Sequence, residues 1–245
     1  MYYMDMTNTT SAKLVPGYYF SPGFYMTYWQ NVILANFTLD IIKSHNNLTK
    51  HREMWVGAIL AASNSKGSGI QHFVGLSEKE PPDVDIIYYK DITTPSGVSG
   101  YERKHIFTEI TRCDLDFGET IINQILRKNT PANAGIVLAV YVYGNEKQTN
   151  YQAILETLKN ENKVYPIEIL CIEFVMFAGA GKILLLPGTY AISRLWPQPG
   201  SKVVNLSDKK AFFRSPNVIG DATPRRGSGT KWQDLGSFTL LPPII

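Results

Sequence analysis

The spacing of hydrophobic residues changes along the chain, and each change predicts a different element. Apolar residues recur at helical spacing over 24–44 and again over 50–62, which predicts two helices. Residues 1–22 are polar and rich in turn-forming Pro and Gly, so an irregular arm or cap is expected there. Residues 63–69 are small and polar and predict a loop.

The middle of the chain has the pattern of a sheet whose strands are separated by turns and helices. A short turn follows the first strand-like segment, so this strand and the next are expected to form an antiparallel hairpin. The continuous apolar, β-branched run over 135–143 is typical of a strand that is buried on both faces. Strands are predicted over 83–89, 105–113, 135–143 and 167–176, and helices over 118–129 and 150–162.

Strands that alternate with helices indicate an α/β fold with a mixed central sheet flanked by helices. After residue 177 the pattern shifts to short strands separated by Pro-Gly turns, over 182–186, 189–193 and 202–206. We therefore expect three parts: an N-terminal arm and helix (1–48), an α/β core (49–177) and a β-rich, basic C-terminal extension (178–245).

Composition excludes several classes of protein. The 245 residues are 44% hydrophobic and 18% charged, which supports a sizeable core and excludes global disorder. The net charge of +3 is too small to argue for a nucleic-acid partner by itself. Cys113 and Cys171 are the only cysteines, which excludes a disulfide framework and a cysteine-rich zinc site.

The sequence pattern also bears on location. No apolar run reaches the roughly 18 residues of a membrane helix. The first residues lack a basic region followed by an apolar stretch, so secretion is not expected. We expect a cytoplasmic protein without a membrane partner.

Two acidic residues are the main candidates for chemistry. Asp83 follows two prolines at the start of a predicted strand, and Glu109 lies in the middle of the next strand. Pairing of these strands brings both carboxylates to one end of the sheet, with the backbone carbonyl of Ile110 as a natural third ligand. Such oxygen ligands suit Mg²⁺ or Mn²⁺, which can activate water and neutralise charge on a phosphodiester.

The order of these elements resembles the PD-(D/E)XK nuclease superfamily, which has a restriction-endonuclease-like fold. The resemblance covers residues 49–176: a helix with a glutamate, Pro-Asp on a strand, a hairpin, a strand with Glu, a helix and a buried strand. It implies that Asp83 is the motif aspartate and Glu109 the motif glutamate. Glu53, on the preceding helix, is similar to the acidic residue that many members place there.

The chain departs from this family at the motif lysine. The lysine is expected two residues after the glutamate, where this chain has Thr111, which cannot supply a positive charge. Arg112 follows, but alternation along the strand directs it to the opposite face. Lys128, on the next predicted helix, is our candidate for the replacement cation.

Structural alternatives stay open for each of these residues. Asp83 could simply cap the edge of a strand, and Glu53 could interact with the helix dipole. Gln124 and Lys128 also fit a solvated helix face. Asp85 shares a strand face with Asp83 and could be a second acid, but we expect it to face solvent.

The C-terminal segment mixes basic and aromatic residues, which suits phosphate neutralisation and stacking on exposed bases. An ordinary solvated surface explains the same pattern. The candidate nucleic-acid-binding residues are Lys209, Lys210, Arg214, Arg225, Arg226 and Lys231.

Three functions are compatible with these patterns. The first is a metal-dependent nuclease that hydrolyses DNA phosphodiester bonds with Mg²⁺ or Mn²⁺. The second, favoured by Thr111, is a non-catalytic member of the same fold that binds nucleic acid or serves as a subunit, as a homodimer or with a partner. The third is an unrelated α/β binding domain whose carboxylates are structural.

Overall fold

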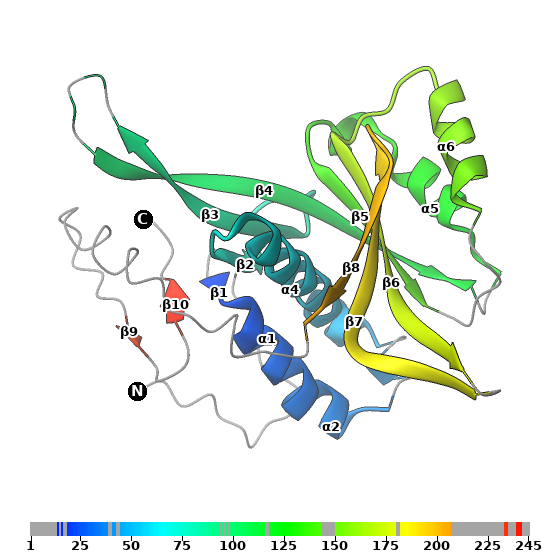
Figure 1. The fold of residues 1–245 in the computed structure, drawn as a ribbon, viewed down its shortest axis with the longest axis horizontal. Coiled ribbons are helices and arrows are strands. Elements are labelled where there is room, and N and C mark those ends of the chain that lie inside the picture. The colour runs from blue at the N-terminus through cyan, green and yellow to red at the C-terminus, as the bar shows by residue number, and fades with distance from the viewer. Residues whose placement is uncertain are drawn as a thin grey trace. The chain divides into compact units, whose positions relative to one another are not determined.

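The computed structural model describes most of the chain up to residue 206 and two short strands near the C-terminus (Figure 1). The described residues are 14, 16, 19–38, 41–42, 45–93, 95, 97, 99–115, 118–143, 150–179, 182–206, 233–234 and 239–241. They form a mixed α/β structure that divides into two compact units. Unit 1 comprises residues 1–78, 84–105 and 209–245, and unit 2 comprises residues 79–83 and 106–208. The three-part domain organisation stays a prediction.

Unit 1 is built around one long helix that packs on an antiparallel sheet. Its helices are α1 (Pro22–Tyr28), a π-helical segment (Trp29–Ile33), α2 (Leu34–Asn36) and α4 (Thr49–Ser68). Its strands are β1 (Tyr19–Phe20), β2 (His72–Leu76), β3 (Val84–Thr93), the first part of β4 (Ser99–Asp114), β9 (Gln233–Asp234) and β10 (Thr239–Leu241). They lie in the order β4-β3-β2-β1-β10-β9.

The helix α4 is longer than its sequence suggests. The loop expected over 63–69 is wrong, because the helix continues to Ser68 and ends at Gly69, whose φ of 71° is left-handed. The hydroxyls of Ser65 and Ser68 donate to the carbonyls of Ala61 and Asn64 at 2.8 Å. These side chains satisfy their hydrogen bonds inside the helix, so small polar residues do not end it here.

The helix expected over 24–44 is also shorter than predicted. A continuous helical stretch runs from Pro22 to Asn36 with the π-helical segment in the middle, Phe37 is extended, and Ile41 and Ile42 are helical again. Ser21 caps the start, since its Oγ accepts from the N–H of Phe24 at 3.3 Å. Trp29 stacks on Trp55 of α4 with ring centroids 5.0 Å apart, which joins the two helical segments.

Unit 2 holds the parallel part of the fold. Its strands are the second part of β4, β5 (Val137–Tyr143), β6 (Glu168–Gly179), β7 (Lys182–Trp196) and β8 (Gly200–Asn205), in this spatial order. Its helices are α5 (Ile121–Lys128) and α6 (Tyr151–Asn160). The strands β4, β5 and β6 pair in parallel, whereas β7 and β8 are antiparallel to their neighbours.

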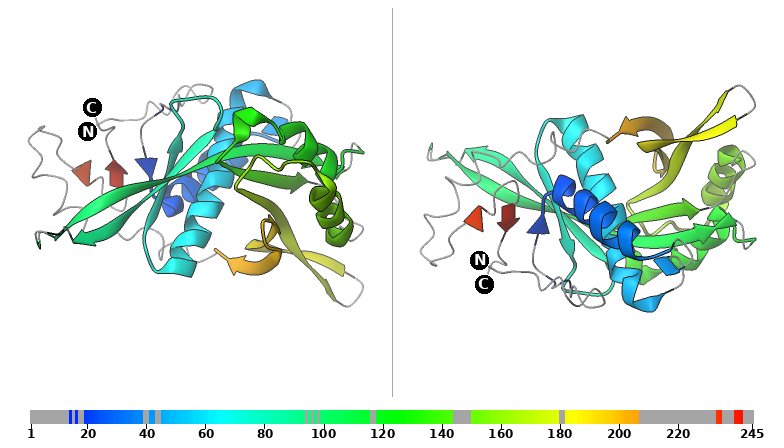
Figure 2. Two further views of the ribbon diagram at one scale, coloured as in Figure 1. Left: turned by 90° about the horizontal axis from the view of Figure 1, so that it is seen from above. Right: turned by 90° about the horizontal axis from the view of Figure 1, so that it is seen from below.

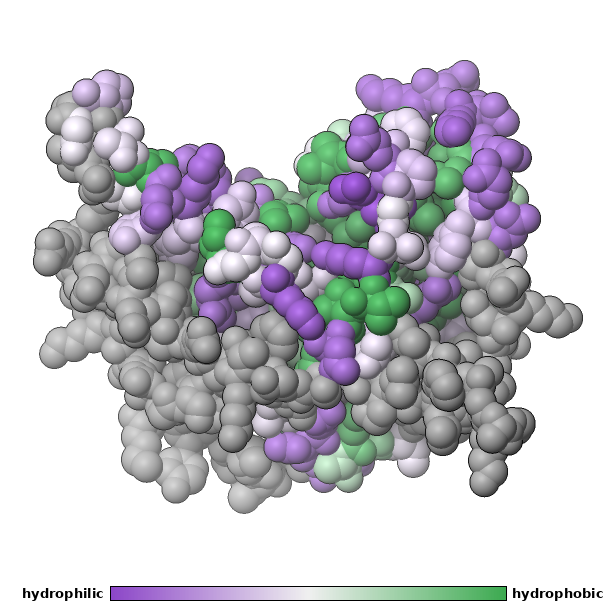
Figure 3. Space-filling model, viewed as in Figure 1, coloured by the Kyte–Doolittle hydropathy of each residue, from purple (hydrophilic) through white to green (hydrophobic). Residues whose placement is uncertain are grey.

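Both helices of unit 2 cover the same face of its sheet (Figures 1 and 2). Ile125 of α5 and Leu158 of α6 pack with Leu138 and Val140 of β5 in one buried core. The opposite face of α6 is hydrophilic, as Figure 3 shows, and its exposed polar residues are Gln152, Glu156, Lys159 and Asn160. This amphipathic pattern matches the helix predicted over 150–162.

The expected α/β class and mixed sheet are confirmed, and so are the strands and helices of the middle third. The two short strands expected over 182–186 and 189–193 are wrong, because β7 is one strand that pairs with β6 across a register shift. The Pro187-Gly188 segment lies at this register shift, where Gly188 has a left-handed φ of 71°, and the strand continues on both sides of it. Among the described residues, no helix is both long enough and apolar enough to cross a membrane.

Candidate metal and phosphate site

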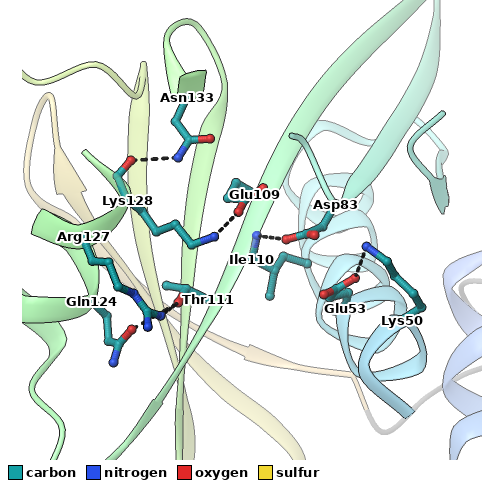
Figure 4. Close-up of polar contacts among 10 residues, drawn as sticks. All are labelled: Lys50, Glu53, Asp83, Glu109, Ile110, Thr111, Gln124, Arg127, Lys128 and Asn133. Atoms are coloured by element: carbon teal, nitrogen blue, oxygen red, sulfur yellow. Dashed lines mark hydrogen bonds and ion pairs between the residues drawn. The ribbon is translucent and has the colours of Figure 1, made fainter. Parts of the chain in front are cut away.

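Asp83 lies at the start of the hairpin, one residue before β3. Its Oδ2 accepts a hydrogen bond from the backbone N–H of Ile110 at 2.8 Å (Figure 4). The carboxylate therefore takes the place of a carbonyl in the ladder at this point of β4. This contact fixes Asp83 beside the strand that carries Glu109, as the sequence predicted.

Glu109 is buried in the middle of β4, with 5% of its surface exposed. Burial raises the pKa of its carboxyl above the usual value, and the nearby Asp83 acts in the same direction through its charge and a hydrogen bond. Lys128 acts against this shift, because its Nζ forms a hydrogen-bonded ion pair with Glu109 Oε1. The two carboxylates and the ammonium thus interact as one group.

Lys128 reaches Glu109 because of the way α5 begins and packs. Thr120 caps the helix by accepting from the N–H of Asn123 at 3.3 Å. Ile121 and Ile125 bury one face of the helix against the sheet. The lysine lies in the last turn, where a cation is favoured by the helix dipole.

The register of the sheet explains why α5 and Glu109 meet. In the parallel pair β4–β5, Glu109 lies opposite Leu138, and Thr111 lies opposite Val140. Leu138 and Val140 belong to the core that includes α5, so Glu109 and Thr111 are on the sheet face that α5 covers. The proposed replacement of the motif lysine by Lys128 is therefore compatible with the geometry.

Thr111 has neighbours that the sequence interpretation did not include. Its Oγ1 lies 3.4 Å from Gln124 Oε1 and accepts from Nη2 of Arg127 at 3.2 Å. Gln124 was also expected on a solvated helix face, but it is buried. The spacing of α5 contained a signal for this cluster, since Gln124, Arg127 and Lys128 occupy positions i, i+3 and i+4.

The residues of this site fit a hard divalent cation by their chemistry. Asp83 and Glu109 supply carboxylate oxygens, and a bound cation would offset the burial and the repulsion that raise the Glu109 pKa. The N–H of Ile110 points to Asp83, and in an extended strand the carbonyl points to the same side. Within the described ranges, no group of three or more His, Cys, Asp or Glu side chains converges on one point.

Other predicted site residues lie elsewhere. Glu53 belongs to unit 1, on α4, where it pairs with Lys50 at 3.1 Å, and its expected assisting role stays a prediction. All six basic residues of the expected nucleic-acid-binding segment fall within 207–232, outside the described residues. The function expected for them also stays a prediction.

Asp85 does not face solvent, so that expectation is wrong. Only 4% of its surface is exposed. Its Oδ2 accepts from the hydroxyl of Tyr19 at 2.5 Å and lies 2.8 Å from Nδ1 of His105. Tyr19 lies on β1 and His105 on β4, 66 and 20 residues away from Asp85 in the sequence.

No family model, curated protein or solved structure matches the chain. Its function is therefore inferred from the residues of the site in unit 2, where Asp83, Glu109 and Lys128 form one interacting group.

Proposed function

We propose that this protein is a metal-dependent nuclease that hydrolyses DNA phosphodiester bonds, as a member of the PD-(D/E)XK superfamily. The observation that carries the proposal is the ion pair of Lys128 with Glu109, beside Asp83. A cation from α5 lies at the carboxylate pair where the motif lysine is missing from β4.

The order of elements supports the same proposal. Along the chain α4, β2, β3, β4, α5 and β5 follow one another. Asp83 precedes β3, Glu109 lies in β4, and β5 is parallel to β4. This is the order on which the resemblance rests, with β2 as an additional strand.

Each residue of the site has a part in the proposed reaction. Asp83, Glu109 and the carbonyl of Ile110 would hold Mg²⁺ or Mn²⁺, which supplies an activated water and neutralises phosphate charge when bound. Lys128 provides positive charge beside the attacked phosphate, where the transition state has more charge on its oxygens. Its contact with Glu109 also acts to lower the pKa of that carboxyl, which favours the ionised form that binds a cation.

Isosteric amides at the two carboxylates test the proposal. Asp83→Asn and Glu109→Gln should each abolish Mn²⁺-dependent cleavage of DNA, because an amide oxygen carries no charge to hold the cation. Glu156→Gln, an exposed position on α6, is the matched control and should cleave like the wild type. Full metal-dependent activity in both site variants, with native circular dichroism, would contradict the assignment.

A non-catalytic, nucleic-acid-binding subunit with the same fold is the second candidate. Thr111 at the lysine position favours it, because this neutral side chain is fully engaged with Gln124 and Arg127. A wild-type protein that binds DNA but does not cut it with Mg²⁺ or Mn²⁺ would favour this candidate over the nuclease.

A further inference from the structure

Thr111 and Arg127 form a contact that the carboxylate site does not require. The Thr111 side chain is buried, with 3% of its surface exposed. Its hydroxyl can donate to Gln124 Oε1 at 3.4 Å while it accepts from Arg127 Nη2 at 3.2 Å (Figure 4). Thr111 therefore holds the guanidinium of Arg127 through Nη2, and Gln124 holds the hydroxyl of Thr111 in turn.

Two neighbouring cations of α5 contact neighbouring positions of one strand face. Lys128 bonds to Glu109, and Arg127 bonds to Thr111, two residues further along β4. Glu109 and Thr111 share a face because side chains alternate along a strand. The guanidinium of Arg127 thus lies next to the carboxylate site, in contact with Thr111, which occupies the position of the motif lysine.

The two cations of α5, Arg127 and Lys128, have partners of different charge. Lys128 forms an ion pair with Glu109, whereas the partner of Arg127 is a neutral hydroxyl. Arg127 forms none of the ion pairs found among the described residues, and its residue surface is exposed. A guanidinium has five N–H donors in a planar fork, and the hydroxyl uses one of its nitrogens.

We propose that Arg127 binds the non-bridging oxygens of a substrate phosphate, with Thr111 and Gln124 as its positioning residues. This role rests on the proposed nuclease function. In it, Lys128 and Arg127 together replace the missing motif lysine. Lys128 supplies positive charge at the carboxylate pair beside the attacked phosphate, and Arg127 holds the non-bridging oxygens of that phosphate. A planar, permanently charged fork matches two phosphate oxygens better than an ammonium does.

Substitution of Arg127 tests its contact with the phosphate. Arg127→Ala should lower kcat/KM for a short DNA duplex by about 10- to 100-fold, the scale of losing a charge-assisted hydrogen bond. The dependence of log Kd on log salt concentration should become shallower by about one unit. Arg127→Lys keeps the charge but loses the fork, so its kcat/KM should lie between those of the wild type and Arg127→Ala.

The matched control is Arg112→Ala. Arg112 is an exposed arginine one residue from Thr111, on the opposite face of β4. Removing Arg112 changes the net charge by the same amount as removing Arg127. Because Arg112 lies on the opposite face of β4, its removal should leave kcat/KM and the salt dependence close to wild type. A melting temperature for every variant identifies loss of fold.

The positioning role of Thr111 has a separate readout. Thr111→Val keeps the volume but removes the hydroxyl, so the guanidinium loses its anchor and KM should rise about 3- to 10-fold. The value of kcat should change little, and Thr111→Ser should restore KM. A purely structural threonine would change the melting temperature without this rise in KM.

The outcomes separate this inference from the proposed function. If the wild type cleaves DNA and Arg127→Ala matches Arg112→Ala in kcat/KM and Kd, the phosphate role is wrong and the nuclease stands. If the wild type binds DNA without cleavage and Arg127→Ala alone weakens binding, the nuclease is wrong and the phosphate role stands. If the wild type neither binds nor cleaves DNA, both are wrong.

Discussion

Glu109 shows at the scale of one residue how burial and charge act against each other. The side chain lies inside the sheet, where water cannot stabilise its charge, and Asp83 adds repulsion. The ammonium of Lys128 compensates only in part, so the pKa of Glu109 remains raised. A carboxyl in this state gains from a divalent cation, because the cation favours its ionised form.

The raised pKa predicts how stability depends on pH without divalent ions. The protonated form of Glu109 favours the folded state, so this contribution is present below the pKa of the unfolded chain and is lost as the pH rises through the folded pKa. The unfolding free energy of the wild type should therefore fall relative to that of Glu109→Gln as the pH rises from about 4. Urea unfolding at a series of pH values measures this difference.

Added Mg²⁺ or Mn²⁺ provides the control for this titration. If the cation binds Glu109, it should lower the Glu109 pKa in carbon NMR and raise the melting temperature of the wild type more than that of Glu109→Gln. A stability difference that does not vary with pH, or a Glu109 pKa at its usual value, would contradict the raised pKa.

Lys128 is expected to act on both rate and pH dependence. Lys128→Ala should lower the cleavage rate by about 10²-fold, the scale of losing one group that stabilises the transition state. It also removes the cation that lowers the Glu109 pKa, so the acid limb of the pH–rate profile should move to higher pH. Lys159→Ala, an exposed lysine in the last turn of α6, is the control and should leave rate and profile unchanged.

The positions of the site residues could be predicted from the sequence in part. The proximity of Asp83, Glu109 and Lys128 could be predicted because strand pairing and helix order constrain which elements meet, and their roles stay predictions. The burial of Asp85 could not be predicted, because it depends on Tyr19, 66 residues away in sequence. The contact of Arg127 with Thr111 was not predicted either, because it depends on how α5 packs against β4 and not on a local pattern.

At the scale of elements, α5 is the support of the candidate site. Arg127 and Lys128 both lie in its last turn, so their positions depend on a helix of only eight residues. Short helices are marginal by themselves, and α5 depends on its Thr120 cap and on the burial of Ile121 and Ile125.

Removal of the helix cap is expected to weaken this support. Thr120→Ala should lower the unfolding free energy by about 1 kcal/mol, because the N–H of Asn123 loses its side-chain acceptor. Thr157→Ala is the control, since the Thr157 hydroxyl only donates back to the Ala153 carbonyl within α6. Chemical denaturation measures the unfolding free energy of both variants, and equal values for Thr120→Ala and Thr157→Ala would contradict the capping role.

Elements with strong local patterns were predicted well, and those set by distant pairing were not. The strands β3 and β5 and the second half of β4 have β-branched or apolar runs that specify them locally, whereas residues 99–104 of β4 are mostly polar and were not predicted as strand. The two-residue strand β1 exists only through its pairing with β2 and β10. No local pattern can specify so short a strand.

At the scale of the whole molecule, each of the two units has buried apolar residues of its own. In unit 1 the helix α4 is buried along most of its length, and Met54, Ala58, Ile59 and Ala62 are completely inaccessible. In unit 2, α5 and α6 cover one face of the parallel strands. The candidate site uses only residues of unit 2, so the packing of α4 can be tested by stability alone.

Two glycines of α4 provide a matched pair for this test. A Cβ at Gly57 would lie 2.8 Å from Val74 Cγ2 and 3.2 Å from Val84 Cγ2, whereas a Cβ at Gly67 meets nothing within 4 Å. Alanine favours a helix by up to about 1 kcal/mol over glycine, but overpacking a core costs about 1–3 kcal/mol. Gly57→Ala should therefore lower the unfolding free energy, and Gly67→Ala should raise it slightly. Denaturation followed by the fluorescence of Trp29 and Trp55, which stack in unit 1, measures both. A Gly57→Ala variant as stable as Gly67→Ala would mean that α4 does not pack closely on β2 and β3.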